Sequence, residues 1–490
     1  MSAGREIAVI DVGSNSVRLV LFRVEGRALW PVFNEKATAG LGRGAGETGR
    51  LNPDGVEIAL RALRRFAALL DAKGVTERLA VATAAVRECE DGPDFAERVK
   101  TETGFEVRVI SGEEEGRLSA VGVLSGMGEG DGVAGDLGGS SLELTPVSGR
   151  KAGMAVTLKL GPLAVLNGGS DSPRDTIDAA LEDAASVFDG SGPDFYAVGG
   201  AWRAFAQLGM ALRDYPLHLV HEFAMTPGDI SRTADFAATQ SECSLASLPG
   251  VSSKRAATLP YAAMLLKRIV KTGKFKRVVF SSHGLREGVA FETAIKVIEP
   301  GDPLLAGAEA LASGAVPEPG FGPDLAAWIE PVFTAEAPLF ADRRDPLLRA
   351  AACRLADMGA RMHPDHRAEL AMEQTLYAPF GGLSHAERAY LALAIHHRYA
   401  GKAQRPDDCP ARRLIDDGGE EAALRLGLAL RLGAALSGRA PGLLKAFALE
   451  RTKDELVLRV EPGREEMVVD RALSRFETLA GVLGLTARVI

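Results

Sequence analysis

The sequence predicts an α/β fold of two similar halves, followed by a mostly helical region and a small α/β segment at the end of the chain. Three observations support this prediction. Strand-like apolar runs alternate with helical patterns over residues 7–281. A turn of aspartate followed by glycine and serine closes an apolar run at Asp11 and again at Asp136. Beyond the Pro/Gly-rich stretch 314–323, the sequence is rich in Ala, Leu and Arg and is helical in pattern up to about Leu436.

In the first half, apolar clusters between turn residues indicate strands, and apolar residues at every third or fourth position indicate helices. The expected strands are 7–11, 17–23, 28–36, 79–83 and 107–110. A helix is expected to start at Asn52-Pro53-Asp54, a pattern typical of a helix N-terminus, and others are expected over 93–103 and from Ser111 onward. A glycine-rich loop covers 39–46.

The second half repeats this alternation after a glycine-rich linker, 126–132. Its expected strands are 133–136, 142–147, 154–160, 196–198 and 277–281, and its expected helices are 176–188, 201–212 and 259–271. After residue 440 the pattern predicts strands 447–450 and 456–460, a helix 471–483 and a strand 487–490. We therefore divide the chain into a first lobe (1–127), a second lobe (128–305), a helical domain (306–440) and a C-terminal segment (441–490).

Composition limits the class of protein. The chain has 490 residues, of which 46% are hydrophobic and 6% aromatic, so it is long enough for about three globular domains. A net charge of −8 disfavours a nucleic-acid-binding protein. The four cysteines include no CxxC pair, which disfavours a disulfide framework or a zinc site. Because no signal peptide or membrane-length apolar run is present, we expect a cytoplasmic protein that does not bind a membrane.

The two Asp-x-Gly turns have the composition of a phosphate-binding site. Glycines let the backbone approach a ligand closely, and successive backbone N–H groups with serine hydroxyls bind anions. An adjacent carboxylate suits a hydrated Mg²⁺ that accompanies phosphate. Asp136 is the best metal-ligand candidate, with Glu143 across the hairpin and Asp11 as its counterpart in the first lobe. The alternative for each aspartate is that it caps its own turn.

Several motifs in order resemble one family. They are Asp11-x-Gly13-Ser14-Asn15-Ser16, Thr83–Arg87, Glu114-Glu115-Gly116-Arg117, Asp136-x-Gly138-Gly139-Ser140-Ser141-x-Glu143, Leu160-Gly161, Gly199-Gly200, Tyr215–His218 and Gly284–Gly288. Together they resemble the exopolyphosphatase/guanosine pentaphosphate phosphohydrolase family over about residues 6–290. The resemblance implies two actin-like (RNase H-like) lobes with the active site in the cleft between them.

The resemblance also implies roles for individual residues. Glu115 matches the catalytic glutamate that activates water, whereas Glu113 and Glu114 are explained by the dipole of a helix N-terminus. Arg87 matches a phosphate-contacting arginine, although the residues alone favour a solvent-exposed arginine there. The proposed phosphate ligands are Ser14, Asn15, Ser16, Arg87, Gly138, Gly139, Ser140 and Ser141. Mg²⁺ is the implied cofactor, with Mn²⁺ as the alternative.

The chain departs from the family pattern in three places. Ser140 replaces the third glycine of the phosphate loop, and Ala356 stands where an HD-type helical domain carries its metal-binding histidine, so we expect no second metal site. The segment after 440 is not explained by the motifs. The helical domain also contains a basic set, which is either a lane for a polyanion or a group of solvated side chains: Arg361, His363, His366, Arg367, His396, His397, Arg398, Lys402, Arg405, Arg412 and Arg413. Its histidines also allow a metal site, which we rank far lower.

We therefore expect a Mg²⁺-dependent exopolyphosphatase that removes terminal orthophosphate from inorganic polyphosphate. The alternative with the same chemistry is a guanosine pentaphosphate (pppGpp) 5′-phosphohydrolase that forms ppGpp, and the motifs do not separate the two. An ATP-dependent kinase of the actin superfamily and a non-catalytic sensor are more remote. The family also implies a homodimer.

Overall fold

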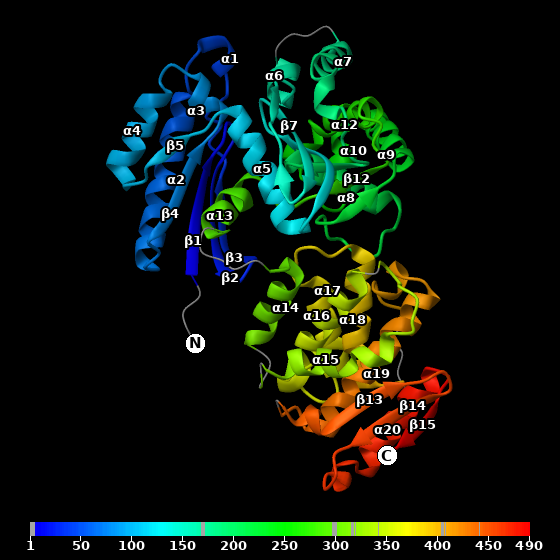
Figure 1. The fold of residues 1–490 in the computed structure, drawn as a ribbon. Helices are drawn as coiled ribbons and strands as arrows, with labels where there is room; N and C mark the ends of the chain where they lie inside the picture. The colour runs from blue at the N-terminus through cyan, green and yellow to red at the C-terminus, as the bar shows by residue number, and fades with distance from the viewer. Residues whose placement is uncertain are drawn as a thin grey trace. The chain divides into compact units, whose positions relative to one another are not determined.

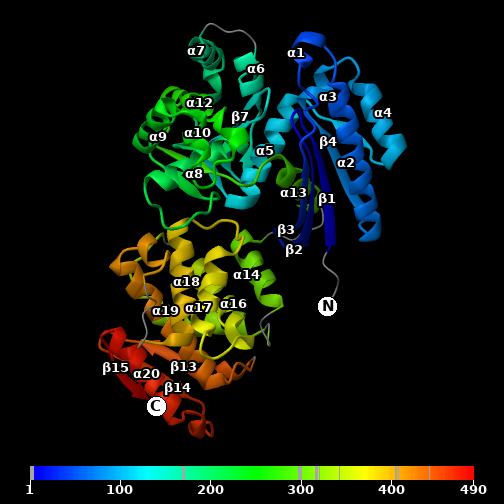
Figure 2. The ribbon, with the colours of Figure 1, turned by 180° about the vertical axis from the view of Figure 1, so that it is seen from behind.

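The computed structural model describes residues 5–167, 172–295, 301–314, 318, 320–341, 343–402, 406, 408–440 and 442–490 (Figures 1 and 2). The chain forms two compact units, Met1–Pro303 and Leu304–Ile490. The predicted division between the second lobe and the helical domain, at 305/306, lies two residues from this point. Arg405 of the basic set, and residues 315–317 and 319 of the predicted boundary stretch, lie outside the described residues.

The first lobe is built on a sheet with the strand order β3-β2-β1-β4-β5. β1 is antiparallel to β2 and parallel to β4, which is parallel to β5. The strands are β1 Arg5–Val12, β2 Val17–Glu25, β3 Ala28–Ala37, β4 Glu77–Ala82 and β5 Val107–Val109. The helices are α1 Ala45–Thr48, α2 Pro53–Ala72, α3 Ala84–Glu88, α4 Gly92–Thr103 and α5 Gly112–Met127. Asn52 caps α2 and Ser111 caps α5, at the starts predicted from the sequence.

Alternating residues of β1 enter different cores because successive side chains of a strand point to opposite faces. Ala8 and Ile10 pack in the core that includes Phe66 of α2. Ile7 and Val9 pack in the opposite core, together with Leu118 of α5 and residues of α13 (Leu285–Ile295). The central strand is therefore buried on both faces, as its nearly uninterrupted apolar sequence predicts.

The second lobe has the strand order β11-β12-β10-β6-β7-β8, with β9 paired to β7. β6 is antiparallel to β7 and parallel to β10, which is parallel to β12. The strands are β6 Gly130–Leu137, β7 Leu142–Gly149, β8 Lys151–Ala152, β9 Val156–Leu158, β10 Asp194–Val198, β11 Phe223–Met225 and β12 Arg277–Phe280. The helices are α6 Pro162–Asn167, α7 Pro173–Asp183, α8 Gly200–Leu212, α9 Pro227–Thr239, α10 Glu242–Ala246, α11 Ser253–Ala256 and α12 Leu259–Thr272. Phe195, Trp202 and Phe280 lie in its main core.

Helices α5 and α13 lie between the two sheets (Figure 1). On α5, Leu118 faces the first sheet, whereas Ala120, Val123 and Leu124 pack with the second. The two helices approach closely through glycine: a Cβ atom added at Gly122 would lie 2.0 Å from the carbonyl oxygen of Gly284. This packing places α5, whose first turn carries Glu115, between the lobes.

The second unit is helical up to Ser437 and ends in a small α/β segment. Its helices are α14 Pro303–Ser313, α15 Phe321–Phe333, α16 Arg344–Leu355, α17 Arg367–Tyr377, α18 His385–Ala400, α19 Asp417–Ser437 and α20 Asp470–Val482. The strands β13 Phe447–Arg451, β14 Glu455–Val460 and β15 Thr486–Val489 form a sheet in that order. Among the described helices, none combines the length and apolarity needed to cross a bilayer.

Candidate active site

A cavity of about 230 Å³ lies between the two lobes of the first unit, and both Asp-x-Gly turns line it. The predicted site residues on its wall are Asp11, Ser14, Asn15, Ser16, Glu115, Asp136, Gly138, Gly139, Ser140 and Ser141. Side chains more than a hundred residues apart in sequence are therefore brought together. Of the predicted site residues, which the structure describes in full, Arg87 and Glu143 are not part of this wall.

The two turns have the same hydrogen bonding. In the first, the N–H of Gly13 donates to the carbonyl of Ser16 at 3.0 Å, and in the second the N–H of Gly138 donates to that of Ser141 at 3.0 Å. Asp11 pairs with Arg18 across β1 and β2, and Asp136 pairs with Glu143 across β6 and β7. The aspartates consequently occupy equivalent positions, next to the last pair of each hairpin.

Neighbouring loops fix the peptide planes of both turns. The carbonyls of Ser14 and Asn15 accept from the amides of Gly42 (2.8 Å) and Gly40 (3.0 Å), in the glycine-rich loop. Those of Gly139 and Ser140 likewise accept from the amides of residues 163 (2.9 Å) and 161 (3.1 Å). In a trans peptide the N–H points away from the C=O. The N–H groups that share a peptide with these carbonyls therefore face away from the neighbouring loops. Such ordered N–H groups are donors suited to an anion.

Glu115 lies in the first turn of α5 with its side chain 12% exposed. Burial, and secondly the charge of Asp136, raise the pKa of Glu115 to about 8. Arg87 opposes this shift: its guanidinium donates to the Glu115 carboxylate at 3.3 Å and to the carbonyl of Ile110 at 2.9 Å. Arg87 therefore orients Glu115, and its contact with phosphate stays a prediction.

The aspartates are also held by specific partners. Burial raises the pKa of Asp11, and the nearby charge of Arg286, 3.9 Å away, partly offsets the rise. Burial likewise raises the pKa of Asp136, which accepts a short hydrogen bond from the Ser119 hydroxyl. The charge of Asp11 adds to the raised pKa of Asp136. These carboxylates are close enough to repel one another, an arrangement that a cation would stabilise.

Glu143 lies beside this cavity, 1% exposed, and its Cβ packs against Gly116 of α5. Burial, and then the charge of Glu115, raise its pKa well above the ordinary value, while the Ser141 hydroxyl opposes the shift. This placement makes Glu143 a buried neighbour of Glu115. Its predicted role as a metal ligand stays a prediction.

The donor set fits a hydrated magnesium ion. Among the described residues, no group of three or more His, Cys, Asp or Glu side chains is arranged to hold a metal ion by itself. Asp11 and Asp136 nevertheless supply hard oxygen ligands, and a cation bound between them would oppose the burial that raises the pKa of each. Mg²⁺ is typically held by one or two carboxylates together with water and substrate phosphate, so a pair of aspartates is sufficient.

Sequence reasoning missed the cations of the cavity. Its wall also includes Arg18, Lys36, Arg203, Arg255 and Arg286. Burial, and then the charges of Arg286 and Arg203, lower the pKa of Arg18 to about 10. Arg286 lies in the motif Gly284–Gly288, which could have identified it as a candidate phosphate ligand. Arg203 and Arg255 lie on separate helices, α8 and α11, and no local sequence pattern marks them. Arg18, Arg203, Arg255 and Arg286 are half-buried, and cations clustered in this way favour a bound anion.

In the second unit, the residues of the basic set lie in different surroundings. Arg367 and Arg398 line another cavity, whereas His396 and His397 are buried within α18 and Arg412 pairs with Glu420 at 2.7 Å. Asp357, next to Ala356, binds Arg398 at 2.9 Å.

Comparisons with known proteins identify the family to which the chain belongs. Residues 20–296 match the model of the Ppx/GppA phosphatase family, and residues 304–490 match that of the exopolyphosphatase C-terminal domain. The chain is 28% identical over 298 residues to exopolyphosphatase 1 of Mycobacterium tuberculosis, which covers 58% of this chain and 86% of that protein.

Among solved structures, a Ppx/GppA family member of Aquifex aeolicus is similar with a TM-score of 0.54 and 26% identity, covering 60% of this chain and 99% of that one. An exopolyphosphatase of Cytophaga hutchinsonii shares the fold, with a TM-score of 0.55, 21% identity, and coverage of 60% and 99%. The predicted two-lobed, actin-like α/β fold with a helical region after it is therefore confirmed. The chain belongs to the Ppx/GppA phosphatase family and is an enzyme of the hydrolase class.

Proposed function

We propose that the chain is an exopolyphosphatase that releases terminal orthophosphate from inorganic polyphosphate by attack of water on the terminal phosphorus. The observation that carries the proposal is the convergence of Glu115, the two aspartates, both anion-binding turns and a cluster of arginines on one cavity between the lobes. Phosphoanhydride hydrolysis requires positioning and neutralisation of charge more than covalent chemistry, and these residues supply both.

Glu115 acts as the general base that takes a proton from the attacking water. A base works best when its pKa is near the working pH, and a pKa of about 8 in the ligand-free protein meets this condition. Arg87 holds the carboxylate in one orientation at 3.3 Å and favours its charged form. Ser119 likewise fixes Asp136 through its hydrogen bond.

The turns 13–16 and 138–141 bind the terminal phosphate through backbone N–H groups and serine hydroxyls. Arg18, Arg203 and Arg286 neutralise the charge of the next phosphates along the chain. Asp11 and Asp136 would hold Mg²⁺, with Mn²⁺ as the alternative, and the ion when bound withdraws charge from the phosphate oxygens. The arginine side chains and the two turns position the substrate itself.

The match of residues 304–490 to an exopolyphosphatase C-terminal model supports polyphosphate over pppGpp as the substrate. A direct comparison tests this: orthophosphate release from long polyphosphate and from pppGpp is measured with one preparation. We expect a higher kcat/KM for polyphosphate. Much faster turnover of pppGpp would reverse the assignment of substrate and leave the site unchanged.

Replacing Glu115 by Gln tests the assigned base. Glu115→Gln keeps the size of the side chain and removes its ability to accept a proton, so we expect turnover to fall at least about 100-fold while polyphosphate binding is retained. Glu113→Gln is the matched control, because Glu113 is exposed on the same turn of α5 and is outside the described cavity wall. Full activity of Glu115→Gln would remove Glu115 from the mechanism.

A further inference from the structure

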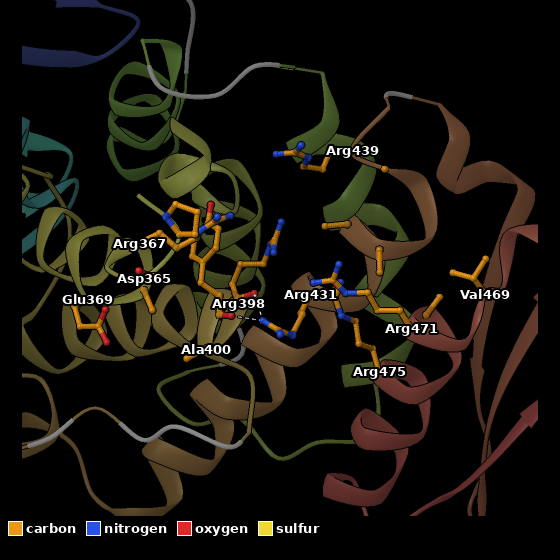
Figure 3. A pocket seen from close by; sticks show the side chains of 17 residues that line it. Asp365, Arg367, Glu369, Arg398, Ala400, Arg431, Arg439, Val469, Arg471 and Arg475 are labelled. Atoms are coloured by element: carbon orange, nitrogen blue, oxygen red, sulfur yellow. Dashed lines mark hydrogen bonds between the residues drawn. The ribbon is translucent and has the colours of Figure 1, made fainter. Parts of the chain in front are cut away.

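A second cavity, of about 530 Å³, lies wholly within the second unit. Its wall comes from helices α17 to α20 and the loops next to them, and arginines dominate it (Figure 3). These arginines are Arg367, Arg398, Arg431, Arg439, Arg471 and Arg475. The acidic side chains of the wall are Asp365 and Glu369. No function assigned above uses this cavity.

Three of these arginines form a group that has no acidic partner among the described residues. Arg431 projects from α19, and Arg471 and Arg475 project from successive turns of α20 toward the same space (Figure 3). Arg431 donates to the carbonyls of Arg398 and Tyr399, and Arg475 donates to the carbonyl of Arg431 at 3.3 Å. In the part of the chain that the structure describes, none of the three is within ion-pair distance of a carboxylate.

Burial and the neighbouring cations both act on two of these arginines. Burial, and then the charges of Arg431, Arg471 and Arg398, lower the pKa of Arg475 to about 10. Burial, followed by the charges of Arg398 and Arg471, also lowers the pKa of Arg431. Bringing these cations together therefore costs free energy, and an anion placed among them would offset that cost.

Other arginines of the same unit are paired. Arg349 binds Glu330 at 2.6 Å, and Arg425, on the same helix as Arg431, binds Glu336 at 3.1 Å. At the edge of the cavity, Arg398 and Arg439 share one carboxylate, that of Asp357, at 2.9 and 4.0 Å. The excess of positive charge is thus a property of this cavity and not of the unit as a whole.

We propose that this cavity binds a small ligand that carries two or more adjacent phosphate groups, separately from the site between the lobes. Guanidinium groups match pairs of phosphate oxygens, and several of them around one space suit a short phosphate chain. The volume falls in the range of small-molecule sites. Small apolar residues, Ala434, Ala435 and Ala472, complete the wall and leave room beside the cations.

The ligand chemistry has two sources, a free oligophosphate or a nucleoside polyphosphate, and the test separates them. Equilibrium binding of tripolyphosphate, and in parallel of ATP and GTP, is measured on the full chain carrying Glu115→Gln, which slows hydrolysis. We expect tripolyphosphate to occupy two classes of site. If ATP or GTP also binds at the second class of site, the ligand is a nucleoside polyphosphate. If only tripolyphosphate binds there, the ligand is a free oligophosphate.

The double variant Arg431→Gln/Arg475→Gln should remove the second class or weaken it at least about tenfold, because two guanidinium groups are lost. Arg425→Gln is the matched control on α19, and it should change neither class. Hydrogen exchange of the chain without these substitutions gives an independent readout, since tripolyphosphate should protect peptides of α19 and α20. This second measurement decides the question even if the double variant does not fold.

Unchanged binding in the double variant, or the absence of protection in α19 and α20, would overturn the proposal. So would binding at this cavity by long polyphosphate alone, because the ligand would then not be small. Failure here is distinguishable from failure of the proposed activity, since orthophosphate release depends on Glu115 and is measured separately.

Discussion

Replacing Glu115 by Gln should change the pH dependence of stability as well as activity. In the folded, ligand-free protein the pKa of Glu115 is raised to about 8, whereas the ordinary value is 4.5. Between these values the folded state holds a proton that the unfolded state has released. The contribution of Glu115 to stability is therefore fully present below about pH 4.5 and is lost as the pH rises toward about 8.

The size of the effect follows from linkage. When one group is protonated only in the folded state, the free energy of unfolding falls by about 1.4 kcal/mol for each unit by which the pH is raised. From about pH 5.5 to about pH 7.5 the wild type should lose up to about 2.7 kcal/mol through Glu115. Gln does not titrate, so the variant should gain up to that amount relative to wild type over the same interval.

The measurement is hydrogen exchange in increasing urea, without divalent cations or phosphate. Peptides from β1, β6 and α5 report the unfolding of the first unit separately from the second. Glu113→Gln, exposed on the same helix, should show no pH-dependent difference from wild type. A stability difference between Glu115→Gln and wild type that is equal at both pH values would refute a protonated Glu115 in the free enzyme.

Three further predictions follow from the same contacts. Arg87→Met removes the cation that opposes the raised pKa of Glu115, so the acidic limb of kcat/KM should move to higher pH, and an unmoved limb would contradict their coupling. Gly122→Ala places a Cβ 2.0 Å from the Gly284 carbonyl and should lower the free energy of unfolding of the first unit by about 1–3 kcal/mol, whereas Gly46→Ala, with open space around it, should not. Chelation by EDTA should stop orthophosphate release, and Asp136→Asn should raise the Mg²⁺ concentration that restores it; activity in EDTA equal to that in Mg²⁺ would exclude the ion.

Much of the fold could be predicted because local sequence determines it. The start of α2 follows from Asn52 and Pro53, and the start of α5 from Ser111, since each cap bonds the amides of its own first turn. The sequence pattern predicts no helix or strand over 213–258, yet this region contains β11 and α9 to α11. β11 has only the residues Phe223–Met225, and such a short strand is defined by its pairing with β12 and not by a local pattern.

The expected strand 154–160 is confirmed only in part. A shorter strand, β9 Val156–Leu158, forms inside it, and the two-residue β8 at Lys151–Ala152 comes before it; both pair with β7. Residues 153–155 separate the two strands, and the amide of Gly153 donates to the carbonyl of Pro146 at 2.8 Å. Pairing with β7 sets the ends of these short strands, which explains why the local sequence pattern predicts one longer strand.

For the site, the sequence by itself determined the two turns and the acidic residues, because each lies in a motif whose spacing sets its geometry. The tertiary structure alone decided which cations accompany them. Arg203 and Arg255 reach the cavity from α8 and α11, and Arg431 meets Arg475 only because α19 packs against α20. A charge cluster formed by residues of distant helices cannot be predicted from local sequence spacing, because the residues next to each arginine in sequence reflect only the packing of its own helix.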